Sequence, residues 1–341
     1  MNTMSPVPKN ISDFFPPTDV LMIRPSCFGW NEQTAETNSF VKINVETPHK
    51  KALIEFDDVV ETIRSYGINV AVVDDLPSPH TPDSMFPTWF SAHHQHKGVV
   101  LLYPMMAENR RLERRRDVLE KLSIEEGFKV SKIADLAPLE NEGEYLEGCG
   151  SLVLDRINRV AYAVLSPRTT LEAVGRFSQH LDYKIVILQA HDENGLPLHH
   201  TNTVMSIAKD FAIVCFEAFS TMQSKNMVLK RLAETGRDVI TISMEQMKSF
   251  AGNIIQLRNQ QGEKVTFMSE RAYSSLDMEQ IKMLAKHGKV VSIAIPTIED
   301  VGGASIGSMI APICLPKKAS RTARRTSKLS PRAKKQTPSI S

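Results

Sequence analysis

The chain has 341 residues, of which 42% are hydrophobic and 23% charged, as is typical of a globular protein with a sizeable core. No apolar run approaches the roughly 18 residues of a transmembrane helix, and the N-terminus lacks a signal-peptide pattern. The four cysteines are widely spaced, without a CxxC pair or zinc spacing. We therefore expect a cytoplasmic protein with reduced thiols, no membrane association and no metal site.

The net charge of +2 is divided unevenly along the chain. Residues 317–341 contain nine Lys or Arg and no Asp or Glu, so this tail carries +9 and the preceding residues −7. The tail has no aromatic residue, cannot form a core, and is predicted to be disordered. Two interpretations remain open: a nuclear-localisation-like segment that binds an import factor or another anionic partner, or a solvated tail without a specific partner.

The first half of the chain predicts alternating strands and helices. Residues 1–18 are Pro-rich and polar, and we expect a flexible segment there. Apolar runs predict strands, and apolar residues three or four positions apart predict helices. The expected elements are strands at 20–25, 69–73 and 99–103, helices at 53–66, 109–126 and 170–181, a hairpin of 151–154 with 160–165, and a strand at 184–188.

The second half repeats this pattern. The expected elements are paired strands at 202–208 and 211–216, helices at 226–235, 244–250 and 276–287, a strand at 239–242, a hairpin of 253–258 with 264–268, and final strands at 290–295 and 309–315. Between the final strands, Gly302 and Gly303 predict a tight loop that presents Ser308 at a cleft. Strand pairs alternating with helices at about 60-residue spacing favour a ββαβ repeat, and the pattern alone leaves both an α/β and an α+β fold with several small sheets open.

Polar residues suited to binding or catalysis lie in several separate motifs. They are Asp83 and Phe86 in PDSMFPTWFSAH, Arg110 in ENRR, Glu147 in LEGCGSLVLDR, Arg168 in LSPRT, His200 and Asn202 in LHHTNTVMSI, and Ser308 in IPTIEDVGGASIGSMIAPICLP. Each residue alone has a structural alternative: a turn aspartate, a glutamate at a strand end, a satisfied loop histidine or a solvated arginine. Their order along the chain is what favours a common site.

In this order the motifs closely resemble those of the arginine deiminase/amidinotransferase superfamily, the penteins, and within it the citrulline-utilisation hydrolases. The resemblance covers about residues 20–316. It implies a five-bladed α/β propeller of ββαβ repeats with pseudo-fivefold symmetry, formed by one domain over residues 19–316. It also implies a small amino-acid substrate or ligand at the centre, with no metal or organic cofactor. The oligomeric state is left open, with a homodimer as the candidate assembly.

The same resemblance implies a role for each motif residue. Glu147, His200 and Ser308 occupy catalytic positions, and the implied substrate-binding positions are those of Asp83, Phe86, Arg110, Arg168 and Asn202. In such enzymes a thiolate attacks the guanidino or ureido carbon, and a histidine protonates the departing amine and then activates water. Carboxylates hold the planar N–H groups of the substrate, and arginines hold its α-carboxylate.

Ser308 departs from the family pattern, which has cysteine at this position. An alcohol is far less acidic than a thiol, whose free pKa is ~8.5. The first hypothesis is therefore a hydrolase of the C–N bond in citrulline- or arginine-type amino acids, impaired by the serine. The alternative is a catalytically dead pseudoenzyme that binds a ligand or partner. A laboratory Cys→Ser change would also fit, but Ile306, Gly307 and Pro312 depart from the pattern too, which favours natural divergence.

Cys149 is a second thiol to consider. It lies two residues after Glu147 on the predicted strand, so it either lines the pocket or is a small buried thiol. The segment FPTW is also shorter than the corresponding family segment by one residue and lacks its two asparagines. Both departures concern substrate recognition rather than the fold.

Overall fold

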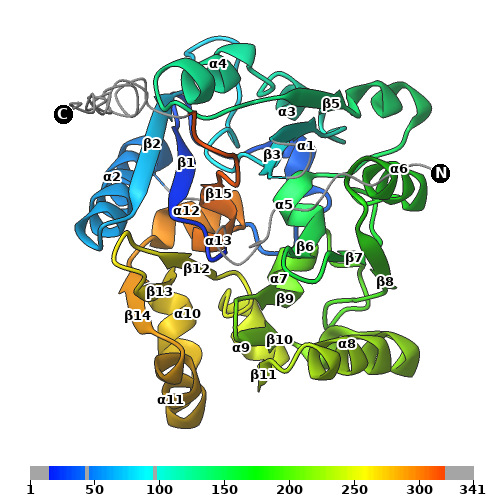
Figure 1. Ribbon diagram of the computed structural model, residues 1–341. Coiled ribbons are helices and arrows are strands. Elements are labelled where there is room, and N and C mark those ends of the chain that lie inside the picture. Colours follow the sequence, from blue (N-terminus) through cyan, green and yellow to red (C-terminus); the bar gives the residue numbers. More distant parts are fainter. Residues whose placement is uncertain (1–14, 43–45, 95–97, 319–341) are drawn as a thin grey trace, which may run out of the picture.

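The computed structural model describes residues 15–42, 46–94 and 98–318. These residues form five three-stranded sheets around a central axis, with the longer helices on the outside (Figure 1). In every sheet the middle strand pairs antiparallel with the inner strand and parallel with the outer strand. This arrangement confirms the predicted five-bladed α/β propeller of ββαβ units.

Four blades follow the order of the chain. In each, the strands are given in the order inner, middle and outer. One blade contains β3 (Phe90–His93), β4 (Val99–Leu102) and β5 (Lys132–Asp135), and the next contains β6 (Leu152–Asp155), β7 (Val160–Val164) and β8 (Lys184–Leu188). The two that follow contain β9 (Met205–Ile207), β10 (Phe211–Val214) and β11 (Asp238–Thr241), and then β12 (Ile255–Arg258), β13 (Lys264–Ser269) and β14 (Lys289–Ile293).

The fifth blade joins the two ends of the domain. Its inner strand β15 (Ala311–Pro312) pairs antiparallel with β1 (Asp19–Arg24), which pairs in parallel with β2 (Asn69–Asp74). The last strand of the chain thereby completes the first blade and closes the ring.

One longer helix, or a pair of helices, crosses from the middle to the outer strand of each blade. These are α2 (Pro48–Ser65), α4 (Arg116–Ile124), α6 (Leu171–Leu181), α8 (Met222–Glu234), and the pair α10 (Glu270–Ser275) and α11 (Met278–Lys286). The helix α6 buries Ala173, Val174, Phe177 and Leu181, the 3–4 spacing of one helix face. A capping box of Asp277 and Gln280 fixes the start of α11.

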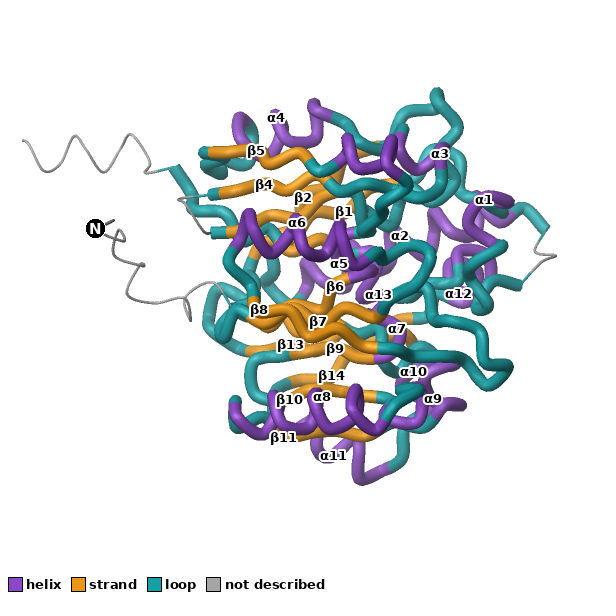
Figure 2. Tube along the Cα trace, turned by 90° about the vertical axis from the view of Figure 1, so that its right-hand side faces the viewer, coloured by secondary structure: helices purple, strands orange, loops and turns teal. Residues whose placement is uncertain are grey.

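The core lies between adjacent blades. The middle strands β7 and β10 are buried along their whole length, because side chains cover both of their faces. Figure 2 shows that short helices gather on one side of the five sheets, among them α1 (Glu32–Ala35), α3 (Glu108–Arg111), α9 (Met244–Lys248) and α12 (Pro296–Gly302). That side carries the polar residues singled out in the sequence.

Most predicted elements are confirmed with shifted ends, but two predictions before the C-terminal segment are wrong. Residues 109–126 form two helices, α3 and α4, because Arg114 between them turns to the Glu140 carboxylate and Arg115 to the Asp74 carbonyl. Residues 202–208 are not one strand: a helical turn, α7 (Thr201–Val204), precedes β9. The short strands β3 and β5 were not predicted.

The first of the two predicted final strands is confirmed as β14, but the tight loop predicted after it is wrong. Pro296 begins helix α12, whose C-cap Gly303 has φ +60. Glycine is required at position 303 for two reasons: the φ is positive, and a Cβ there would lie 2.5 Å from the Asn38 side chain. A second helical turn, α13 (Ile306–Met309), carries Ser308 and leaves only two residues for β15.

Short parts of both terminal segments belong to the described body. Phe15 is buried, and the Pro17 carbonyl accepts a hydrogen bond from the Arg258 backbone. At the other end, Lys317 pairs with Asp19 at 2.8 Å. Residues 1–14 and 319–341, which hold most of the predicted flexible segment and basic tail, lie outside the described residues. Within the described ranges, every helix is too short or too polar to cross a membrane.

Candidate functional site

The five-fold repeat places one polar side chain just before or beside each inner strand. Asp83 precedes β3, and Asn253 precedes β12. Glu147 and His200 occupy the N-caps of the helical turns α5 (Gly148–Ser151) and α7. Ser308 lies in α13, directly before β15. Residues far apart in the sequence therefore occupy equivalent positions around one axis.

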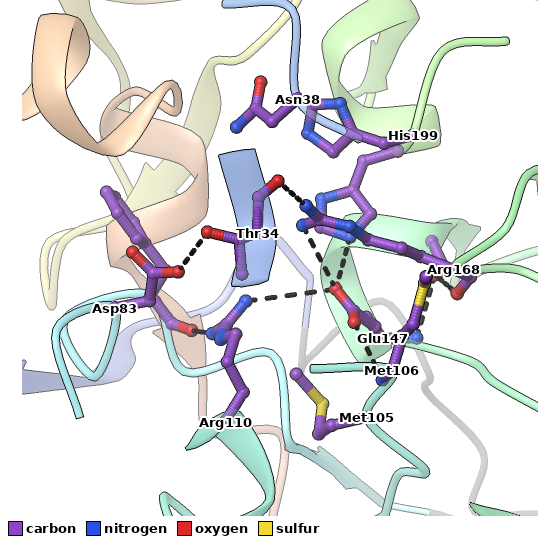
Figure 3. A network of polar contacts seen from close by, with 12 residues as sticks. Thr34, Asn38, Asp83, Met105, Met106, Arg110, Glu147, Arg168 and His199 are labelled. Atoms are coloured by element: carbon purple, nitrogen blue, oxygen red, sulfur yellow. Dashed lines mark hydrogen bonds and ion pairs between the residues drawn. The ribbon is translucent and has the colours of Figure 1, made fainter. Parts of the chain in front are cut away.

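Glu147 is fully buried at the centre of an ion-pair network (Figure 3). Its Oε2 lies 2.8 Å from His200 Nε2, 3.7 Å from Arg168 Nη1 and 3.9 Å from Arg110 Nη1. The Met106 backbone N–H donates to its Oε1 at 3.2 Å. Burial opposes the charge, but Arg168, His200 and Arg110 outweigh it and lower the pKa of Glu147 to about 2.

His200 is the partner of this carboxylate. Burial lowers the pKa of His200 below its ordinary value, although the hydrogen bond to Glu147 acts in the opposite direction. Because ionised Glu147 only accepts, the neutral imidazole must donate Nε2–H and keep Nδ1 unprotonated. The structure thus brings together two of the predicted site residues and sets the tautomer of His200.

Gly150 leaves the space that the His200 ring fills. A Cβ at Gly150 would lie 2.6 Å from His200 Nδ1, closer than real Cβ contacts allow. We expect Gly150→Ala to displace the ring from Glu147 and to destabilise the protein by about 1–3 kcal/mol. Thermal unfolding measures the effect. Gly175→Ala in α6 is the matched control, because its Cβ meets no atom within 4 Å and should be neutral or stabilising.

The arginines predicted to hold a substrate carboxylate are buried and already bonded. Arg168 donates Nε–H to Thr37 Oγ1 at 2.7 Å and Nη2–H to the Thr34 carbonyl. Arg110 makes a two-pronged contact with Glu113 at 2.9 and 3.0 Å and donates to a backbone carbonyl at 2.6 Å. Both guanidinium groups therefore face Glu147, and their role toward a substrate stays a prediction.

Asp83 lies on the other side of the same network. It accepts hydrogen bonds from Asn31 Nδ2 at 2.7 Å and Thr34 Oγ1 at 2.9 Å, so Thr34 links Asp83 to Arg168 (Figure 3). Phe86 contacts Phe28 edge-on, with ring centroids 6.5 Å apart.

These partners come from the segment of residues 28–42 around α1, which covers the site. Sequence analysis missed the segment, because it is polar and has no periodic pattern.

Ser308 contacts a different set of groups. Its Oγ accepts hydrogen bonds from Asn202 Nδ2 and Asn253 Nδ2, each at 3.0 Å, and its backbone N–H donates to Asn253 Oδ1 at 3.1 Å. Within the described part of the chain, the hydroxyl bonds only to these two amides and not to His200. Asn253 was not among the residues predicted to form the site. Its position just before an inner strand, which it shares with other site residues, is the feature that could have identified it.

The surroundings of Ser308 suit a thiolate better than an alcohol. An amide oxygen is too weak a base to remove the hydroxyl proton, and serine nucleophiles need a dedicated base. Two amide N–H groups aimed at one atom would instead favour a negative charge there, as on an ionised cysteine. Asn202, which was predicted to bind substrate, donates a hydrogen bond to Ser308 in this structure. Substrate binding by Asn202 stays a prediction.

Cys149 is not part of the predicted strand but of the helical turn α5. Burial raises the pKa of its thiol to about 11, so the thiol is protonated at neutral pH and is a poor substitute nucleophile. Among the described residues, no group of three His, Cys, Asp or Glu side chains could hold a metal ion.

Solved structures share the fold at low sequence identity. A mutant N-terminal domain of ArgZ, an arginine dihydrolase of cyanobacteria bound to substrate, aligns with TM-score 0.66 and 18% identity over 87% of this chain and 98% of that chain. A mutant DDAH from Pseudomonas aeruginosa complexed with citrulline aligns with TM-score 0.58 and 13% identity over 86% and 98% of the two chains. Full-length ArgZ, with TM-score 0.68 and 17% identity over 88% of this chain, is covered over only 41% of its length. No curated protein matches the sequence.

The five blades define the pentein fold that this chain shares with these structures. Residues 24–315 match the family described as N,N dimethylarginine dimethylhydrolase, eukaryotic. The chain belongs to this family.

Proposed function

We propose that this protein binds an arginine-type amino acid through its guanidino or ureido group, and that Ser308 holds its hydrolysis far below that of a cysteine-bearing relative. One observation carries the proposal: the Glu147–His200 pair is intact at 2.8 Å, whereas the Ser308 hydroxyl meets only amide groups. The carboxylate and the imidazole expected from the family motifs are thus in contact, whereas a serine stands where the family has its nucleophilic cysteine.

The network can recognise a planar cation. The side-chain oxygens of Glu147 and Asp83 accept hydrogen bonds, so both residues suit the N–H groups of a guanidinium or ureido group. His200, held neutral by burial with Nδ1 unprotonated, could take up a proton at Nδ1 and then pass it to the departing amine. What the site lacks is an ionisable atom at position 308 to form the covalent intermediate.

Two of the structural neighbours bind a ligand although a serine replaces one of their cysteines. The ArgZ domain bound to substrate and the DDAH complexed with citrulline are both cysteine-to-serine mutants. In this chain the bound ligand would compete with Thr34 for two groups, the Asp83 carboxylate and the Arg168 guanidinium. We therefore propose that the segment 28–42 shifts when ligand enters.

Asp83→Asn is expected to weaken binding of L-arginine and of N,N-dimethylarginine at least tenfold, because the amide replaces an ionic acceptor with a neutral group that can present an N–H. Isothermal titration calorimetry on the full chain measures the effect. Asp57→Asn is the matched control: this half-exposed carboxylate pairs with Arg24 on the outside of the fold. Equal affinity in wild type and Asp83→Asn would contradict binding at this site.

A further inference from the structure

A cavity of about 130 Å³ lies on the central axis, separate from the network around Glu147. The inner strands of all five blades line it, through Ser91, residues 152–154, residues 205–207, residues 255–256 and Pro312. Its inner wall contains Asn202 and Asn253, the two amides that bond to Ser308. Asp83, Glu147 and His200 do not line it, so it is a second site behind the first.

Arg156 lines this cavity and is 9% exposed. Its Nη1 donates to the Ala92 carbonyl at 3.2 Å and lies 3.2 Å from His93 Nδ1. Among the described residues, Arg156 forms no ion pair with a carboxylate. Every other arginine buried to this extent does: Arg110 with Glu113, Arg168 with Glu147 and Arg237 with Asp155. A buried charge without a counter-charge is costly, which makes Arg156 an exception that needs a partner.

The neighbours of Arg156 do not supply a negative charge. Burial raises the pKa of the Cys149 thiol to about 11 and raises the pKa of the Tyr103 hydroxyl as well. Burial and Arg156 itself hold the pKa of His93 well below its ordinary value. All three groups are therefore neutral at physiological pH, and the positive charge of the guanidinium remains uncompensated.

A second polar group beside the cavity also lacks a partner. Ser206 lines the cavity from β9, and its buried Oγ forms no hydrogen bond with the described residues. A hydroxyl can donate to an anionic oxygen, and a guanidinium presents parallel N–H donors that match carboxylate and phosphate oxygens.

We propose that the axial cavity binds a small oxyanion, a phosphate or a carboxylate, through the Arg156 guanidinium. A volume of about 130 Å³ is of the order that a small ion such as inorganic phosphate or acetate fills, so these two ions are the probes. This site is independent of the binding proposed for arginine-type amino acids at Asp83 and Glu147.

Titration calorimetry of the full chain with inorganic phosphate and with acetate, at constant ionic strength set by chloride, tests the proposal. We expect saturable binding of at least one of them, and the tighter one identifies the class of oxyanion. Arg156→Gln should weaken it at least tenfold. Arg159→Gln is the matched control: it removes the same charge from the same turn, where Arg159 pairs with Asp182 outside the cavity.

Ser206→Leu provides a second variant, because it fills the cavity and leaves Arg156 in place. It should abolish binding, and it decides the question if Arg156→Gln does not fold. Absence of binding by wild type, or unchanged affinity in a folded cavity variant, would overturn the proposal.

Asp13→Asn completes the set, since Asp13 is two residues before the cavity-lining Phe15. Binding that appears only in Asp13→Asn would show that the chain supplies its own carboxylate, and would also overturn it.

Discussion

Ser308→Cys is expected to raise the hydrolysis of arginine-type amino acids by on the order of 10³-fold or more, because loss of a covalent nucleophile typically costs at least that much. The thiol gains from its surroundings: Asn202 and Asn253 each place an Nδ2 3.0 Å from the atom at position 308. Two such donors favour the thiolate, the attacking form. Release of ammonia or dimethylamine, with mass spectrometry of the amino-acid product, measures the rate.

Two further variants show whether the gain comes from the proposed chemistry. Ser308→Ala should be as inactive as wild type, because neither has an ionisable atom at that position. Ser308→Cys combined with Asn253→Ala should lose part of the gain and show a higher thiol pKa in the rate of alkylation against pH. Robust turnover by the serine protein would contradict the proposed impairment. Inactivity of Ser308→Cys with intact ligand binding would instead favour the pseudoenzyme alternative.

Glu147→Gln is expected to cause the largest loss of stability, about 3–5 kcal/mol at neutral pH, because a buried ion pair is broken from one side. Arg110 keeps Glu113, but Arg168 has no other carboxylate among the described residues within ion-pair distance. Urea denaturation measures the free energy of unfolding. Glu172→Gln is the matched control, since its exposed pair with Arg176 should contribute less than about 1 kcal/mol.

The effect of Glu147 on stability should depend on pH in one direction. Its pKa is about 2 in the folded protein and 4.5 as an ordinary value, a difference that corresponds to roughly 3 kcal/mol. A lowered pKa contributes stability above the unfolded value and loses it as pH falls toward the folded value. The stability gap between wild type and Glu147→Gln should therefore narrow between about pH 4.5 and pH 2. A constant gap would mean that the Glu147 charge does not stabilise the fold.

The sequence was enough to predict the five middle strands, which are rich in apolar and β-branched residues, and the family resemblance then predicted that they belong to five blades. It was not enough for the short elements that carry the site. The turns α5, α7 and α13 have four residues each, too few to show helical periodicity. Residues 202–204 were therefore assigned to a strand, and Ser308 to a loop.

Glu147 and His200, which were both predicted to belong to the site, are in contact, because the repeat brings the N-caps of two neighbouring turns together. Contacts between blades were harder to predict. Asn253 and Thr34 bond to residues that lie 55 and 134 positions away, and no local pattern announces such contacts. A charged residue is easily recognised as a candidate site residue, whereas the contacts of an asparagine or threonine become known only from the fold.

The protein is expected to bind its ligand and to leave it unchanged. Titration of the full chain with N,N-dimethylarginine and L-arginine, followed by mass spectrometry of the contents of the same cell, tests binding and turnover together. We predict saturable binding of at least one ligand, with the ligand recovered intact. Recovery of citrulline or ornithine in excess over the protein, or no binding of either ligand, would contradict the account.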